Sequence, residues 1–487
     1  MNIILLLISV PWTIRLVGNL LSYVHLWYVK EYRWDRMWIH LHTKQGRLIL
    51  FPARRIPPLS PKAVVLFFST FLACGALFFL LPVHPLLALF VLDIALFPIT
   101  ALLVLLMKLP TTLYHEYKIA QALAKFGAQS KMTVIGITGS FGKTSTKENL
   151  ATILGSKYKV LKTEASKNSP IGIAETLLEK PTSTYDVFVV EMGAYKKGEI
   201  ARMSQMVKPK IGIITAINTQ HQDLFGTIET TMKAKYELIS GLVGKRIAIF
   251  NADNKYTRQM AQWAVKDGCR VWLYAKENYK LLNAEKIFRA ENIVSDLAHV
   301  AFDVCVEKSR VHVSVNVLGE HQVSNILAAI AGAVAGGMTL NDAVKAAGSI
   351  RHNPKTLELI PGINGSIYIN DTFNNNPDAA KAALAVLAKA SGRKILVFQP
   401  MIELGSYARA SHNEVGREAG RVCDDIILTN GNFADDFIAG VHSSSPEKNV
   451  VILSPIETAK FIRGTGKKDD AVLFKGKEAE FAFRLLI

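Results

Sequence analysis

Two long apolar runs near the N-terminus constrain the fold of this chain more than any other feature. Residues 63–81 carry no charge, and residues 86–107 carry only one, Asp93. Each run is close to the ~20 apolar residues that a helix needs to cross the hydrocarbon core of a bilayer. The link between them, residues 82–85, is short and uncharged. The sequence therefore predicts a transmembrane hairpin, and the alternative is a buried hairpin in a soluble domain.

Basic residues flank this hairpin on both sides. Those before it are Lys30, Arg33, Arg36, Lys44, Arg47, Arg54, Arg55 and Lys62, and those after it are Lys108 and Lys118. The positive-inside rule places both flanks in the cytoplasm. Residues 1–29 are also largely apolar and predict either a first membrane helix or an interfacial one. We therefore expect residues 1–110 to anchor the chain in the plasma membrane through two to three transmembrane helices, with membrane lipid as a partner and the rest of the chain cytoplasmic.

Charge and cysteine content narrow the classes of function. The formal net charge is +17, which is compatible with nucleic acid, an anionic membrane surface or phosphorylated substrates. Because no zinc-finger spacing or RNA-binding aromatic signature accompanies this charge, we expect membrane and phosphates as partners and no nucleic acid. The four cysteines lie far apart, so the sequence predicts neither a disulfide framework nor a zinc site. Asp93 is a functional candidate because of its place in an apolar run, although a hydrogen bond between helices would also explain it.

From about residue 130 the sequence alternates between short β-rich runs and helix-like stretches. The runs are 133–137, 187–190, 211–215, 246–250, 367–369, 395–398, 426–429, 450–453 and 472–474, and the clearest helices are 325–335 and 379–390. Such alternation is typical of α/β layers with mainly parallel sheets. We expect a linker helix at 111–130, a nucleotide-binding α/β domain at 131–350 and a Rossmann-like α/β domain at 351–487, divided by a break near 348–354.

The sharpest motif is a phosphate-binding loop between a predicted strand and a predicted helix. It reads Thr138, Gly139, Ser140, Phe141, Gly142, Lys143, Thr144 and Ser145. Glycines let the backbone approach phosphates, and the N–H groups of the following helix favour anions. Lys143 would lie on the β- and γ-phosphates of ATP, and Thr144 would give its hydroxyl to Mg²⁺. The first glycine of the general pattern is displaced to Gly136, so the match is to a variant loop.

Other polar residues follow predicted strands or open helices. Glu191 ends a buried strand, where a carboxylate beside a phosphate loop can hold Mg²⁺, although it could equally cap a helix. The remaining candidates are individually weaker, because each has an ordinary structural explanation in packing or in an Asx turn. They are His221, Lys235, Asn325, Asp371 and Asn374.

Taken together, these blocks resemble the Mur ligase family. The matching stretches run in family order over about residues 131–478: GITGSFGKTSTKENLATIL, VEMGAYKKGEIA, NTQHQDLFGTIETTMKAKYELISGL, FNADN, LGEHQVSNILAAIA, INDTFNNNPDA and MIELG. The resemblance implies an ATP-dependent amide ligase of peptidoglycan synthesis that forms an acyl phosphate. Its substrates would be a muramoyl-tripeptide, or another envelope precursor, and D-alanyl-D-alanine or another amine donor.

The resemblance also implies residue roles. Lys143 and Thr144 match the phosphate-loop pair, while Glu191 and His221 match two magnesium ligands. Lys235 matches a lysine that carries a carbamate in the family and could then help to hold a second metal. Three further positions are implied to contact the nucleotide or to complete the closed site. They are Asn325, Asp371 and Asn374.

Four departures separate this chain from the family pattern. The usual Pro-Gly-Arg before the last domain reads Pro354-Lys355-Thr356, so that Lys355 or Arg351 would have to replace the arginine. The usual Gly-Asp reads Gln399-Pro400, and the usual His-Asn reads His321-Gln322. The apolar segments stand where the family has its UDP-binding domain. These departures leave two alternatives open, which are a membrane ligase of another envelope polymer, such as a poly-γ-glutamate synthase, and a non-catalytic nucleotide-binding scaffold.

Overall fold

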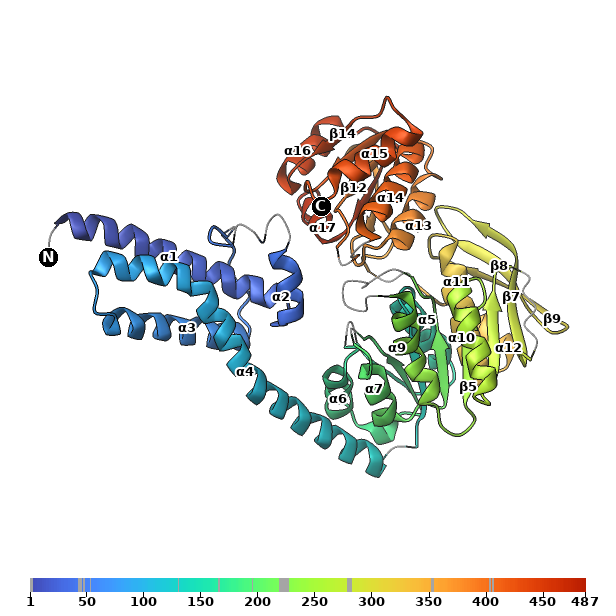
Figure 1. Ribbon diagram of the computed structural model, residues 1–487. Helices are drawn as coiled ribbons and strands as arrows, with labels where there is room; N and C mark the ends of the chain where they lie inside the picture. The colour runs from blue at the N-terminus through green and yellow to red at the C-terminus, as the bar shows by residue number, and fades with distance from the viewer. Residues whose placement is uncertain are drawn as a thin grey trace. The chain divides into compact units, whose positions relative to one another are not determined.

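The computed structural model describes residues 3–42, 46, 49–52, 54–129, 131–164, 167–194, 196–218, 227–277, 283–351, 354–402, 404 and 407–487. The chain divides into two compact units, Met1–Lys118 and Ile119–Ile487. The first unit is helical, and the second contains two β-sheets with helices on their faces (Figure 1).

The first unit is built from α1 (Ile3–Val29), α2 (Trp34–Leu41), α3 (Pro61–Leu80) and the start of α4 (Pro85–Gln129). Within the described residues, three helices are long and apolar enough to cross a membrane: Leu7–Val29, Pro61–Leu80 and Pro85–Gly127. The two predicted apolar runs fall in α3 and α4. Helix α4 contains Pro98 and Pro110 and continues without a break to Gln129, so that the predicted linker helix is the last part of α4.

Aromatic side chains hold the helices of the first unit together. Trp27 of α1 is fully buried, its ring stacks on Phe97 of α4 at 6.1 Å, and its Nε1 donates a hydrogen bond to Thr100. Asp93 of α4 accepts a hydrogen bond from Asn19 Nδ2 at 3.1 Å and lies 3.0 Å from the guanidinium of Arg15. The sequence left two interpretations of Asp93 open, a functional role and a hydrogen bond between helices. The structure shows the hydrogen bond between helices, together with an ion pair.

The second unit begins with a nine-stranded sheet of order β2-β3-β1-β4-β5-β6-β7-β8-β9. Its strands are β1 (Thr133–Thr138), β2 (Val160–Lys162), β3 (Val187–Glu191), β4 (Ile211–Ile214), β5 (Ile247–Asn251), β6 (Arg270–Ala275), β7 (Lys286–Ser295), β8 (Val300–Val306) and β9 (Ser309–Val315). The strands from β2 to β7 pair in parallel, and β8 and β9 add an antiparallel extension. This extension was not predicted from the sequence.

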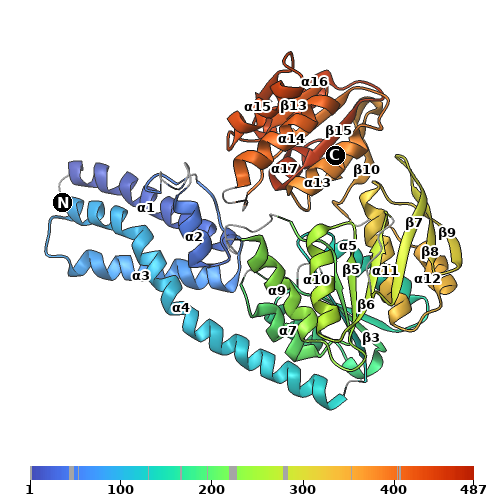
Figure 2. The ribbon, with the colours of Figure 1, turned by 45° about the vertical axis from the view of Figure 1, so that its right-hand side comes forward.

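Helices cover both faces of this sheet (Figure 2). One face packs against α5 (Lys143–Gly155), α11 (His321–Ala335) and α12 (Leu340–Ala347). The other packs against the end of α4 and against α6 (Pro170–Glu179), α7 (Glu199–Val207), α9 (Ile228–Ser240) and α10 (Lys255–Lys266). Because both faces are covered, the central strands are apolar on both sides, as buried parallel strands are.

The C-terminal part of the second unit is a six-stranded sheet of order β10-β11-β15-β12-β13-β14. Its strands are β10 (Glu358–Pro361), β11 (Ile367–Asp371), β12 (Lys394–Phe398), β13 (Asp425–Leu428), β14 (Val450–Ile452) and β15 (Ala471–Lys475). Helices α13 (Pro377–Leu387), α14 (Ala408–Val422) and α15 (Ala434–Ser444) pack on one face, and α16 (Pro455–Thr465) and α17 (Lys477–Arg484) on the other. Only β10 is antiparallel to its neighbour.

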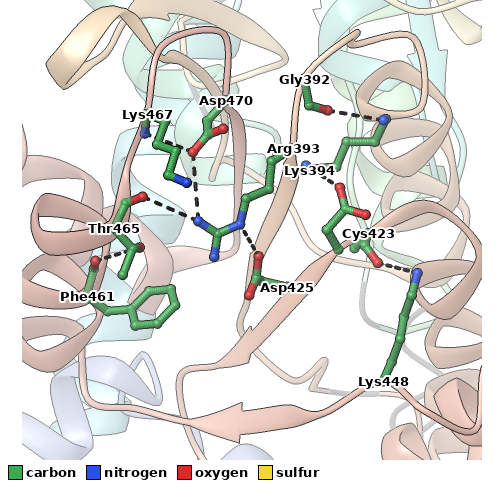
Figure 3. A network of polar contacts seen from close by, with 11 residues as sticks. Gly392, Arg393, Lys394, Cys423, Asp425, Lys448, Phe461, Thr465, Lys467 and Asp470 are labelled. Atoms are coloured by element: carbon green, nitrogen blue, oxygen red, sulfur yellow. Dashed lines mark hydrogen bonds and ion pairs between the residues drawn. The ribbon is translucent and has the colours of Figure 1, made fainter.

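A polar network ties the loops that precede the strands of this second sheet (Figure 3). Arg393 donates to Asp425 at 2.5 Å and to the carbonyl of Thr465 at 3.4 Å, and its guanidinium lies 3.9 Å from Asp470. Active-site residues of open α/β sheets gather at the carboxyl ends of the strands. This network is at the opposite edge, so we assign it to stability.

Candidate nucleotide and metal site

The phosphate loop lies between β1 and α5, as the sequence predicts. Gly139 and Gly142 have φ values of +151° and +82°, which side chains rarely adopt. A Cβ at Gly139 would lie 2.1 Å from Thr215 Oγ1, and one at Gly142 would lie 2.5 Å from Asn325 Oδ1. Ser140 N donates to the carbonyl of Ala216 at 2.7 Å, which fixes the loop against the end of β4. The two glycines therefore allow both the turn and its close packing.

A cavity of about 460 Å³ opens at this loop and brings together residues that are distant in the sequence. The loop contributes the segment from Ser140 to Ser145, and α11 contributes His321 and Asn325. The C-terminal sheet contributes the other wall, which includes Lys355, Asp371, Phe373, Asn374 and Lys475. The predicted residues Lys143, Thr144, Asn325, Asp371 and Asn374 thus share one cavity.

Two basic groups of this cavity are perturbed by burial. Burial lowers the pKa of the Lys143 amine, and the nearby carboxylate of Glu191 opposes that shift. Burial also lowers the pKa of His321 to about 4, and the positive charges of Lys475 and Lys276 act in the same direction. The His321 imidazole is therefore neutral at physiological pH and can offer one donor and one acceptor to a ligand.

Glu191 ends β3 and is only 2 % exposed. Its Oε2 accepts a hydrogen bond from Thr144 Oγ1 at 3.0 Å, and its Oε1 accepts one from Asn168 Nδ2 at 3.0 Å. Carboxylate and hydroxyl oxygens are hard ligands that Mg²⁺ prefers. Glu191 and Thr144 therefore fit this ion, and Asn168, which positions Glu191, is a residue that the sequence interpretation missed.

A fully buried lysine also reaches Glu191. Lys147 of α5 has no exposed side-chain surface, and its Nζ lies 3.1 Å from Glu148 and 3.6 Å from Glu191. The sequence shows Lys147 only as one of several polar residues after the phosphate loop. Its position beside Glu191 arises because β1 and β3 are neighbours in the sheet.

Lys235 lies on α9 and is 3 % exposed. Its pKa is lowered to about 7, mainly by burial and also by the charge of Lys143, while the carboxylates of Glu199, Glu191 and Glu237 oppose the shift. The charges of Lys143 in the phosphate loop and of Glu191 thus both act on Lys235. The other predicted ligand, His221, is in the segment 219–226, which lies outside the described residues.

Asp371 ends β11 and forms a buried ion pair with Lys475 at the end of β15, with 2.5 Å between Oδ2 and Nζ. Burial raises the pKa of Asp371, while Lys475 opposes that rise. The departure at Gln399 has a structural role, because its Oε1 accepts the N–H of Glu478 at 2.9 Å in the first turn of α17. An amide oxygen here satisfies a free helix N–H.

Comparison with known families gives matches over both sheets. The family model of the Mur ligase middle domain matches residues 137–333, and that of the Mur ligase, glutamate ligase domain matches residues 357–478. A curated relative from Escherichia coli (strain K12), a UDP-N-acetylmuramoyl-tripeptide–D-alanyl-D-alanine ligase, is 33% identical over 323 residues, which cover 66% of this chain and 69% of the relative. This chain belongs to the Mur ligase family.

Further comparisons agree with this assignment. A relative of the same name from Bacillus subtilis (strain 168) is 30% identical over 364 residues, covering 73% of this chain and 75% of the relative. The crystal structure of MurF from Acinetobacter baumannii superposes with a TM-score of 0.69 at 26% identity, covering 76% of this chain and 80% of that one. The predicted resemblance, the α/β fold of residues beyond 130 and the class of ATP-dependent ligase are confirmed.

Proposed function

We propose that this Mur ligase joins D-alanyl-D-alanine to a muramoyl-tripeptide precursor in peptidoglycan synthesis, using ATP and Mg²⁺. The observation that carries the proposal is the single cavity in which the phosphate loop of the first sheet faces Asp371 and Asn374 of the second. The identity of the proposed substrates comes from the names of the relatives, which are UDP-N-acetylmuramoyl-tripeptide–D-alanyl-D-alanine ligases.

The first chemical step is phosphoryl transfer from ATP. An oxygen of the substrate carboxylate attacks the γ-phosphorus, the bond to the β–γ bridging oxygen breaks, and ADP leaves. Lys143 and the free N–H groups at the start of α5 stabilise negative charge on the phosphates. The neighbouring Lys235, with its pKa of about 7, adds no full positive charge above that pH.

Thr144 and Glu191 are described residues that would hold Mg²⁺, and Asn168 positions the Glu191 carboxylate through its Nδ2. When bound, Mg²⁺ supplies charge stabilisation for the transferring phosphoryl group. Thr163 Oγ1 accepts the backbone N–H of Glu191 at 3.0 Å, and Gly193 N donates to the carbonyl of Asn168 at 2.8 Å. These bonds fix the backbone at Glu191 and Asn168, and so the points from which the two side chains extend.

The second step forms the amide. The amine nitrogen attacks the carbonyl carbon of the acyl phosphate, a tetrahedral intermediate forms, and phosphate leaves as the amine loses a proton. The C-terminal sheet contributes one wall of the cavity at the phosphate loop. Closure of this wall over ATP would exclude water, which would otherwise hydrolyse the acyl phosphate.

We further propose that the first unit anchors this ligase in the plasma membrane with its two sheets in the cytoplasm. Three helices with the required length and composition and the basic residues around α3 and α4 support this placement. A membrane anchor also fits a second candidate acceptor, a lipid-linked envelope precursor.

The test is release of ADP from Mg-ATP by the full chain in detergent, with UDP-N-acetylmuramoyl-tripeptide and D-alanyl-D-alanine as substrates. We expect release that needs both substrates and that falls at least about 100-fold in Lys143→Ala, because that variant loses a cation at the transferring phosphate. Release with a lipid-linked tripeptide alone would favour the second acceptor. Nucleotide binding without turnover on either acceptor would contradict the proposal.

A further inference from the structure

One buried cation in the cavity wall has no part in the function proposed above. Lys475 is the last residue of β15, and its side chain is 1% exposed. In the parallel pairing of β11 with β15 it stands directly opposite Asp371. Both residues line the cavity at the phosphate loop. The sheet thus presents an ammonium group at its carboxyl edge, where ligands of α/β sheets bind.

Stability alone is a weak explanation for this ion pair. Desolvation of two buried charges costs about as much as their attraction returns, and an apolar pair of similar volume is often equally stable. Among the residues that the structure describes, Lys475 Nζ donates a hydrogen bond to one acceptor, Asp371 Oδ2. A lysine ammonium carries three donors. The pair therefore leaves donor capacity for a ligand in the cavity that the pair lines.

The other cation of this wall is directed elsewhere. Lys355, one of the two residues considered as a replacement for the family's arginine, is 42% exposed, and its Nζ lies 2.8 Å from Glu480. The second residue considered, Arg351, is not among the described residues that line the cavity, and its Nη1 donates to the carbonyl of Ile350. Lys475 is thus the buried cation that the C-terminal sheet turns toward the phosphate loop.

We propose that Lys475 binds the phosphate chain of the nucleotide, with Asp371 holding its ammonium in place. It would face Lys143 across the cavity, so that the polyanionic nucleotide has a cation on each wall and draws the two sheets together. The proposal rests on the function above, since it requires that the cavity binds ATP.

Calorimetric titration of the full chain in detergent tests this assignment, with ADP and adenosine as ligands. We expect Lys475→Met to raise the Kd of ADP about tenfold or more, which is the usual worth of a hydrogen bond from a charged donor. Adenosine has no phosphates, so its Kd should stay unchanged. Lys475→Arg should keep ADP binding, and Lys477→Met, which changes an exposed lysine two residues away, should match the wild type.

Lys475→Met alone leaves the buried charge of Asp371 without its partner. The same substitution is therefore also made in an Asp371→Asn background, because the double variant has neither charge of the pair. A selective loss of ADP binding in this neutral background supports the assignment. Equal losses for ADP and adenosine, or no loss for either, would overturn it and leave Lys475 a structural residue. If the wild type and Lys143→Ala both fail to bind ADP, the proposed function itself falls and this assignment falls with it.

Discussion

Glu191 shows how much of this site depends on single residues that meet only in the folded chain. Its carboxylate contacts Thr144, Asn168 and Lys147, and it is almost completely buried. A buried carboxylate is tolerated only with such partners. Lys147 is the charged one, and it also contacts Glu148, so that a short chain of charges runs from the surface to the predicted metal site.

We expect Lys147→Met to lower the free energy of unfolding by about 3 kcal/mol, because it leaves buried carboxylate charge without its partner. The measurement is denaturant unfolding of the full chain in detergent without Mg²⁺. The matched control is Lys159→Met at an exposed site, which should change stability by less than about 0.5 kcal/mol. Equal stability of the two variants would show that Lys147 does not hold Glu191.

Lys235 gives a prediction that depends on pH. A pKa of about 7 leaves much of its amine neutral at pH 7.5, and only a neutral amine reacts with carbon dioxide to form a carbamate. ¹³C-bicarbonate should therefore label the wild type, and the label should decline as the pH falls below about 7 and the amine is protonated. The measurement is ¹³C NMR.

Two variants serve as controls for this labelling. Lys235→Arg should abolish the signal, whereas Lys233→Arg should keep it, because Lys233 is 57% exposed and pairs with Glu229. A signal that survives in Lys235→Arg would contradict the assignment.

The phosphate loop could be predicted because all its residues are contiguous and their context, strand then helix, is local. Asn168, Lys147 and Lys475 could not, because the order of strands in each sheet brings them to the site. A lone Asn or Lys in a sequence carries no sign of that order.

At the scale of elements, α1 and α4 are joined by the contacts of Asp93 with Arg15 and Asn19. Lys30 follows the end of α1, and Lys108 lies on α4. The separation in sequence between Arg15 and Lys30 equals that between Asp93 and Lys108. If both helices cross the membrane in the same direction, the two charges lie at the same depth. This match favours a spanning α1 over an interfacial one.

We expect Asp93→Leu to destabilise the helical unit, because it leaves Arg15 unpaired in an apolar surrounding, where a charge costs about 3 kcal/mol on insertion scales. The double variant Arg15→Leu/Asp93→Leu should recover the loss. Thermal denaturation in detergent measures both. A double variant no better than Asp93→Leu would show that the pair does not link the helices.

Apolar length was sufficient to predict α3 and α4, because a run without charge is visible in any sequence. The continuation of α4 to Gln129 was not expected as one helix, since the membrane region to residue 110 and the linker helix at 111–130 were predicted separately, and Pro110 lies at their junction. Proline lacks a backbone donor but does not always end a helix that has neighbours to pack against. The antiparallel strands β8 and β9 were also missed, although β9 alternates polar and apolar residues and so carried a signal that could have identified it.

At the scale of the whole molecule, a basic α/β ligase is combined with an apolar helical unit. We expect the full chain to sediment with membranes and to be released by detergent but not by high salt or alkaline carbonate, because burial of α3 and α4 in lipid is hydrophobic and salt does not screen it. Immunoblotting of the fractions measures this. Release by salt alone would indicate that the basic residues merely adsorb the chain to an anionic surface.

The central claim is that a substrate carboxylate takes the γ-phosphoryl group of ATP before the amine arrives. The measurement is transfer of ¹⁸O from a labelled tripeptide carboxylate, followed by mass spectrometry of the released phosphate. The account predicts one ¹⁸O atom in each phosphate released with the amide product, and a rate of product formation at least about 100-fold lower in Lys143→Ala. Amide product accompanied by unlabelled phosphate would contradict the acyl phosphate and with it the account.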